Sequence, residues 1–183
     1  MKTKTRIRPF VDSLRSLLLA TFGLMAFCIS SDASADEFYS TPHHVVAGRP
    51  GSVIRQGTLI GGPPEATAYR VLYRSTGLRG EPIAVSGLVI IPDTPAPVGG
   101  RPVVAWAHPT TGIVSHCAPS MANFKFQQMQ GLREFLNRGY VVAATDYPGL
   151  GTPGPHPYLV GRSEGYAVLD SIRAAREVAQ TGT

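Results

Sequence analysis

The stretch Pro102-Val-Val-Ala-Trp-Ala-His-Pro-Thr-Thr-Gly-Ile-Val-Ser-His-Cys-Ala-Pro-Ser120 contains a short apolar run that stops at a loop of small and polar residues. Residues 103–107 are apolar on both faces, which is typical of a buried strand in a parallel or mixed sheet with helices on each side. His108 to Gly112 ends this strand, because proline lacks a ladder donor and glycine adopts backbone shapes that other residues avoid. Ligands of open α/β sheets bind beyond the carboxyl ends of such strands, so we expect chemistry in this loop.

Strand-like segments precede this stretch. Three runs separated by Gly and Pro clusters predict an antiparallel meander over residues 52–59, 66–75 and 82–91. In the middle run, Tyr69 and Tyr73 fall on one face and Arg70 on the other, which indicates one drier side.

After the stretch, the periodicity changes to that of helices. Apolar spacing predicts a helix over residues 121–137 that ends before Gly139, a second buried strand over 140–146, and a helix over 163–180. The sequence therefore predicts an α/β fold with amino-terminal antiparallel strands followed by parallel strand-helix units. A helix that has crossed one face of a sheet should lead into a further parallel strand, and we expect the fold to be incomplete at Thr183.

The first 35 residues read as a secretory signal peptide. Five basic residues precede the apolar run Leu17 to Ile29, and Ala33-Ser-Ala35 supplies the small residues that a signal peptidase recognises. A retained membrane anchor is the alternative, but the run is shorter than the roughly 20 residues that span a bilayer. A lipid anchor on Cys28 is disfavoured by the bulky Phe27 before it. We expect one domain over residues 36–183, secreted or periplasmic, with no integral membrane segment after cleavage.

Composition excludes several classes of protein. With 43% hydrophobic residues the 183-residue chain is globular rather than disordered. Five of the 17 basic and two of the 12 acidic residues lie in the signal segment, which lowers the net charge from +5 to +2. The remaining arginines are scattered, so no nucleic-acid partner is expected. His43-His44 could bind metal, but without a third ligand at a suitable spacing the pair reads as a solvated loop, and no metal site is expected.

Gly161-Arg-Ser-Glu-Gly165 matches the Gly-x-Ser-x-Gly pattern of a nucleophile elbow. The elbow requires a strand directly before it, yet only Tyr158 to Val160 separate the motif from Pro157, and no histidine follows His156. We therefore interpret the motif as a decoy and Ser163 as the N-cap of a helix.

Other candidate residues leave alternatives open. Cys117 is the only cysteine outside the signal segment, which indicates a missing disulfide partner or a free thiol, and we interpret it as a disulfide half rather than a nucleophile. Asp146 follows a buried strand and could serve as an acid or base, or could hydrogen-bond the loop 147–151. The loop from His108 to Gly112 could itself be an ordinary strand-to-helix turn.

Four blocks in order together resemble the secretory lipase family of α/β-hydrolases, of the type of Candida lipase A. They are Val103-Val-Ala-Trp-Ala-His-Pro-Thr-Thr-Gly112, Cys117-Ala-Pro-Ser120, Gly139-Tyr-Val-Val-Ala-Ala-Thr-Asp-Tyr-Pro-Gly-Leu-Gly151 and Ser163-Glu-Gly-Tyr-Ala-Val-Leu-Asp-Ser-Ile-Arg-Ala-Ala-Arg176. The resemblance covers nearly all of the chain after the signal segment. It implies an incomplete α/β-hydrolase fold in which Thr111 or Gly112 is the first oxyanion position and Cys117 is half of a disulfide.

The resemblance also implies a function. It predicts a lipase or carboxylic ester hydrolase in lipid catabolism, without metal or cofactor, that acts on an ester or lipid substrate. In the family pattern the nucleophile, the acid and the histidine lie beyond Thr183, so the chain alone is expected to be inactive. A non-catalytic secreted binding module and a peptidase of the same fold are the alternatives.

Overall fold

The computed structural model describes residues 37–41 and 48–181, and its fold is that of the unit Phe38–Thr183. The expected signal segment 1–35 and the His43-His44 pair lie outside the described residues.

Five strands form one mixed sheet in the order β1-β2-β3-β5-β4. Their bounds are β1 Val53–Thr58, β2 Ala66–Thr76, β3 Pro82–Pro92, β4 Val103–Trp106 and β5 Val141–Thr145. The first three strands pair antiparallel, which confirms the predicted meander. β3 runs antiparallel to β5, and β4 runs parallel to β5 with Val103 opposite Val141 and Trp106 opposite Ala144.

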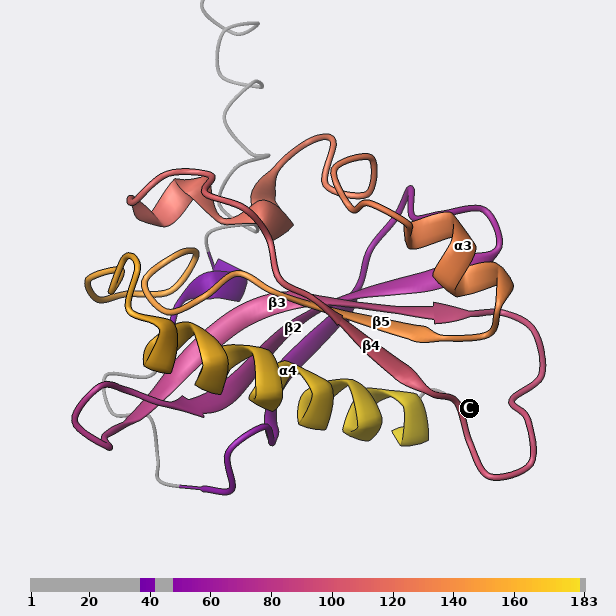
Figure 1. The fold of residues 1–183 in the computed structure, drawn as a ribbon, viewed down its shortest axis with the longest axis horizontal. Helices are drawn as coiled ribbons and strands as arrows, with labels where there is room; N and C mark the ends of the chain where they lie inside the picture. Colours follow the sequence, from indigo (N-terminus) through magenta and orange to yellow (C-terminus); the bar gives the residue numbers. More distant parts are fainter. Residues whose placement is uncertain (1–36, 42–47, 182–183) are drawn as a thin grey trace, which may run out of the picture. The chain divides into compact units, whose positions relative to one another are not determined.

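Helices cover both faces of the sheet (Figure 1). α4, Gly161–Thr181, packs on one face, where Ala167, Ala174 and Val178 join a core formed with β2, β3 and β5. α3, Leu132–Asn137, packs on the other face against Leu88 and Val142. This layered arrangement is that of an α/β protein, as the sequence predicts.

β4 lies at the edge of the sheet rather than in its interior. Among the described residues it pairs with β5 only, and its four residues are half-buried. The expectation of a buried strand is therefore wrong for β4 in degree: Val103 packs against one core and Val104 against the other, yet all four residues stay partly exposed because no strand among the described residues pairs with the second edge of β4. β5, which has neighbours on both sides, is fully buried as expected.

The helix expected over residues 121–137 is wrong over most of its length. Only α3 is α-helical there; two short 3-10 turns, η2 (Ser115–Cys117) and η3 (Pro119–Met121), and a series of turns precede it. Gly131 adopts φ +76°, a left-handed conformation that breaks a helix. Gly139, with φ +80°, lies just beyond the end of α3, as predicted.

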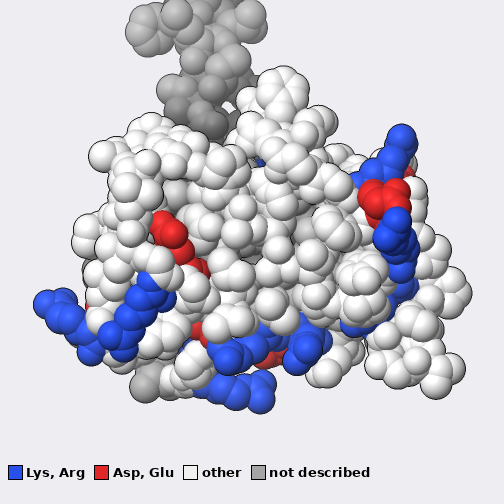
Figure 2. All heavy atoms as spheres, viewed as in Figure 1, with Lys and Arg blue, Asp and Glu red and all other residues white. Residues whose placement is uncertain are grey.

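Figure 2 shows that Lys, Arg, Asp and Glu side chains gather near the periphery of one face of the molecule and leave a broad uncharged area between them. Within residues 37–41 and 48–181, no helix combines the length and apolarity needed to cross a bilayer.

Candidate active site

The parallel pairing of β4 and β5 brings two loops to one edge of the sheet. The loop after β4 contains residues 108–112, which we call the oxyanion loop after the role expected for Thr111 or Gly112, and the loop after β5 begins at Asp146. Because the strands point the same way, both loops leave the sheet at its carboxyl edge. This is the edge at which α/β proteins bind ligands.

His108 closes the base of the oxyanion loop. Its ring is 7% exposed and packs on Tyr147, with 4.3 Å between the ring centroids. Its Nε2 lies 3.1 Å from the backbone carbonyl oxygen of Asp146, and its Nδ1 lies 2.7 Å from the carbonyl oxygen of Pro109. The first residue of the loop is thus attached to the residue at which the loop after β5 begins.

The remaining residues of the oxyanion loop face solvent or a neighbouring loop. Thr110 Oγ1 lies 3.1 Å from the hydroxyl of Tyr158, and Thr111 is exposed. Gly112 has φ +132°, and a Cβ at this position would lie 2.9 Å from Cβ of Cys117 and closer still to its Sγ. Only glycine fits here without displacement of Cys117, so the predicted oxyanion position at Gly112 is tightly packed on one side.

Cys117 is a free, half-buried thiol in the described part of the chain. It lies in η2 and contacts the oxyanion loop through Gly112. Its role as a disulfide half stays a prediction.

Asp146 is a buried carboxylate with several hydrogen bonds at the carboxyl end of β5. It is 1% exposed and accepts hydrogen bonds from Ser86 Oγ at 2.6 Å, from the backbone N–H of Ser120 at 2.8 Å, and from the hydroxyl of Ser120. Burial raises the pKa of Asp146 above its ordinary value of 3.8, although the hydrogen bonds from Ser120 and Ser86 oppose this shift. The expectation that its carboxylate binds the loop 147–151 is wrong, because Ser86 and Ser120 occupy it instead.

Ser163 is buried in the first turn of α4. It is the third residue of α4, its N–H donates to the carbonyl of Val160, and its hydroxyl has no hydrogen-bond partner among the described residues. The N-cap prediction is therefore wrong, since a capping hydroxyl would accept a backbone N–H. A helical backbone at this residue also differs from the strand-to-helix elbow that a nucleophile requires.

Rings line the junction of the two loops. Trp106, His108, Tyr147, His156 and Tyr158 follow one another with centroid distances of 6.1, 4.3, 6.5 and 6.0 Å. This row was not predicted from the sequence. The signal that could have indicated it is the density of histidine and tyrosine on both loops.

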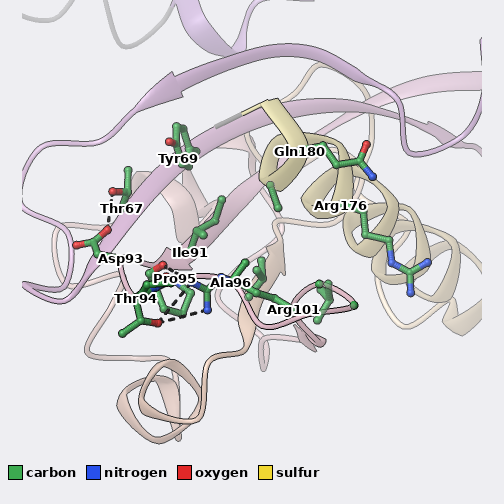
Figure 3. Close-up of a pocket in the computed structure, with 16 residues that line it drawn as sticks. Thr67, Tyr69, Ile91, Asp93, Thr94, Pro95, Ala96, Arg101, Arg176 and Gln180 are labelled. Atoms are coloured by element: carbon green, nitrogen blue, oxygen red, sulfur yellow. Dashed lines mark hydrogen bonds between the residues drawn. The ribbon is translucent and has the colours of Figure 1, made fainter. Parts of the chain in front are cut away.

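A cavity lies at the opposite end of strands β4 and β5, with a volume of about 550 Å³ (Figure 3). It is bordered by Val103 and Val141, the first residues of β4 and β5, and by Arg176 of α4. Arg101 donates there to the carbonyls of Pro92 and Gly139. No predicted site residue lines this cavity, so we place the candidate active site at the carboxyl edge.

Comparisons with known proteins agree with this description of the fold. A sequence model of the secretory lipase family matches residues 121–183. The secreted triacylglycerol lipase LIP1 of Malassezia furfur is 30% identical over 183 residues, which is 91% of this chain and 37% of that protein. A Mycobacterium tuberculosis protein named "Probable inactive lipase MT1628" is also 30% identical, over 81% of this chain and 36% of its own length.

Solved structures share the fold. Candida antarctica lipase A in its closed state superposes with a TM-score of 0.65 at 24% identity, over 84% of this chain and 37% of that one. The cell wall degrading esterase LipA of Xanthomonas oryzae gives a TM-score of 0.56 at 26% identity, over 73% of this chain and 39% of the esterase. The mixed sheet with its helices is thus part of an α/β-hydrolase fold. The chain belongs to the secretory lipase family, and it spans little more than a third of the length of the relatives that it matches.

Proposed function

We propose that this chain supplies the oxyanion loop of an exported serine ester hydrolase that acts on lipid esters. The observation that carries the proposal is the position of Thr111 and Gly112 directly beyond the carboxyl end of β4, a strand that among the described residues pairs on one edge only. In α/β-hydrolases one oxyanion donor comes from the loop at this position, and the other follows the nucleophile.

The proposed chemistry is acyl transfer through a serine ester. A serine on a strand paired with the open edge of β4 attacks the ester carbonyl, and backbone N–H groups of Thr111 or Gly112 stabilise the negative oxygen that forms. In this proposal the serine, the acid and the histidine belong to polypeptide outside these 183 residues. Ser163 takes no part, and the chain alone hydrolyses no ester.

Exposed apolar side chains on both loops support a lipid substrate. Ile113 is 63% exposed, and Leu159 is 75% exposed on the neighbouring loop. Val114 and Val160 are exposed beside them. Exposed apolar patches mark surfaces that contact apolar partners, and here the exposed residues lie on two loops that meet at the contact of Thr110 with Tyr158. The expected signal segment, together with the word "Secreted" in the name of the Malassezia relative, supports export.

A chimera tests the proposal. This chain would replace the matching segment of the Malassezia furfur lipase, and hydrolysis of a triacylglycerol emulsion and of a soluble p-nitrophenyl ester would be measured. We expect activity in the chimera and none in the 183-residue chain. Gly112→Ala keeps the backbone N–H but displaces it through the collision with Cys117, and it should lower kcat by up to about 100-fold with little change in KM, which is the loss typical of one oxyanion donor.

Gly154→Ala is the matched control, because Gly154 also has positive φ, +113°, but a Cβ at this residue would meet no atom within 4 Å. Rates are normalised to the folded fraction of each chimera. A folded chimera in which Gly112→Ala and Gly154→Ala have equal kcat would contradict the assignment of the oxyanion loop.

A further inference from the structure

Buried polar side chains gather where the segment 108–120 meets the end of β5. Ser86, Ser120 and Asp146 are each 3% exposed or less. The hydroxyl of Tyr39 joins them, 2.8 Å from Ser120 Oγ. A buried carboxylate is stable only when hydrogen bonds replace the water that it has lost, so the geometry of this cluster is strictly constrained.

We propose that Asp146 is the positioning residue of the oxyanion loop. Its backbone carbonyl oxygen lies at hydrogen-bond distance, 3.1 Å, from Nε2 of His108, at the start of the segment 108–120. Its carboxylate accepts the backbone N–H of Ser120 at 2.8 Å, at the end of that segment. One residue therefore holds both ends of the segment that contains the oxyanion loop. The inference rests on the proposed function in treating residues 108–112 as that loop.

The middle of the segment is attached to the same neighbouring loop. The backbone N–H of Gly151 donates to the carbonyl of Ser115 at 2.8 Å. Within the segment, the N–H of Cys117 donates to the carbonyl of Val114 at 2.9 Å. Neither bond includes an atom of Asp146, so both report whether the segment as a whole stays in place.

A carboxylate suits this position better than an amide. Ser86 Oγ–H, Ser120 N–H and Ser120 Oγ–H all converge on the two oxygens of Asp146. A carboxylate only accepts hydrogen bonds, whereas the NH₂ group of asparagine only donates. In Asp146→Asn at least one of the three donors then faces the NH₂ group, and a serine hydroxyl in that position must rotate to accept a hydrogen bond instead of donating one. The remaining hydrogen bonds to the side chain lose their charge assistance and weaken.

Fixing the segment matters for the proposed chemistry. Oxyanion donors stabilise a transition state because they are already in place and need no reorganisation when charge develops. Thr110 and Thr111 are exposed, and Thr110 is joined to the neighbouring loop by the hydrogen bond to Tyr158. The position of the loop therefore depends on its anchored ends.

The test compares two buried aspartates in the full 183-residue chain. Asp170 is also 1% exposed and accepts a serine hydroxyl, from Ser75 at 2.7 Å, but it lies in α4 and not against the segment 108–120. Asp146→Asn and Asp170→Asn thus remove the same charge from similarly buried positions. Amide hydrogen exchange, measured by NMR, follows the Cys117 and Gly151 amides together with core amides of β2.

We expect Asp146→Asn to accelerate exchange at Cys117 and Gly151 about tenfold to hundredfold beyond any change at β2, as the loss of a charge-assisted hydrogen bond implies. Asp170→Asn should leave the ratio of loop to core exchange as in the wild type. The proposal is overturned if both variants change that ratio equally. This readout needs no activity, so it fails independently of the proposed function.

A second pair of variants serves if Asp146→Asn does not fold. Ser120→Ala removes one hydroxyl from Asp146, and Ser75→Ala removes one from Asp170. We expect faster exchange at Cys117 and Gly151 relative to β2 in Ser120→Ala only. Equal ratios in these two variants would also overturn the proposal.

Discussion

Replacement of Gly112 by alanine is the most specific perturbation that the structure offers at the oxyanion loop. Gly112 has φ +132°, and a Cβ there would lie 2.9 Å from Cβ of Cys117, with Sγ nearer still. Gly154 has φ +113° with no atom within 4 Å of the same position. Alanine meets unfavourable backbone conformations at both positions but a collision at only one.

The difference between the two variants isolates the collision. A non-glycine residue in a sparsely populated backbone region costs about 1–3 kcal/mol. Replacing glycine also lowers the conformational entropy of the unfolded chain, which stabilises the folded state by about 0.4–1 kcal/mol. Both contributions are common to Gly112→Ala and Gly154→Ala. Overpacking against Cys117 adds about 1–3 kcal/mol, so Gly112→Ala should lose that much more free energy of unfolding than Gly154→Ala.

Urea unfolding of each variant, followed by tyrosine and tryptophan fluorescence, measures these free energies. A double-mutant cycle with Cys117→Ala removes Sγ, and we expect a favourable coupling of about 0.5–3 kcal/mol with Gly112→Ala. The coupling should be incomplete because Cβ of residue 117 remains. Equal losses in Gly112→Ala and Gly154→Ala, or zero coupling with Cys117→Ala, would refute the steric reasoning.

Further outcomes follow from the buried polar groups and from α4. Burial raises the pKa of Asp146 in the folded chain, so above pH 3.8 the folded chain binds more protons than the unfolded chain. The free energy of unfolding of the wild type, relative to that of Asp146→Asn, should therefore fall as the pH rises from 3.8 through the raised pKa. Urea unfolding at a series of pH values measures this difference. Tyr39→Phe removes the hydrogen bond to Ser120 and should cost about 1 kcal/mol in the same assay. Ser163→Ala removes an unpartnered buried hydroxyl and should raise the free energy of unfolding by about 1 kcal/mol, with no loss of activity in the chimera. Gly165→Ala in the second turn of α4, where a Cβ meets nothing within 4 Å, should raise the melting temperature through a gain of about 0.5–1 kcal/mol.

The strands were predictable because their signals are local. Gly and Pro clusters separate the runs that became β1, β2 and β3, and the pairing follows from the short turns between them. The parallel pair β4 and β5 followed from apolar runs too short for helices. Each of these inferences uses residues close together in the chain.

The prediction of a helix over residues 121–137 was wrong because the spacing of apolar residues indicates which side chains are buried more directly than it indicates the backbone conformation. Met129, Leu132 and Leu136 are buried together, as their spacing predicts. Met129 reaches that core from a turn, and Gly131 with φ +76° separates it from α3. Phe124, at the start of the same pattern, is 69% exposed. A helical pattern thus survives in a segment that is α-helical over only its last six residues.

The cluster around Asp146 could not be predicted from sequence. Its members come from positions 39, 86, 120 and 146, and no local pattern relates a tyrosine before the sheet to a serine in β3. Only the register of β3 against β5, with Gly87 opposite Thr145, brings Ser86 next to Asp146. The strand topology and register determine such long-range polar contacts. The sequence predicted only the class of fold and not the register, so it could not predict these contacts.

The motif Gly161-Arg-Ser-Glu-Gly165 does not form a nucleophile elbow, and the conformation of its glycines agrees with this. In an elbow, the serine is held on a sharp and strained turn between a strand and a helix. In this chain the carbonyl of Val160 accepts the N–H groups of Ser163 and Glu164, so the backbone is already helical at the serine. A Cβ at Gly161 or Gly165 would meet nothing within 4 Å, and neither glycine has positive φ. Gly112 has both the positive φ and the close neighbour that these glycines lack. The loop after β4 is the proposed site because it lies beyond the carboxyl end of that strand, whereas the motif lies inside a helix.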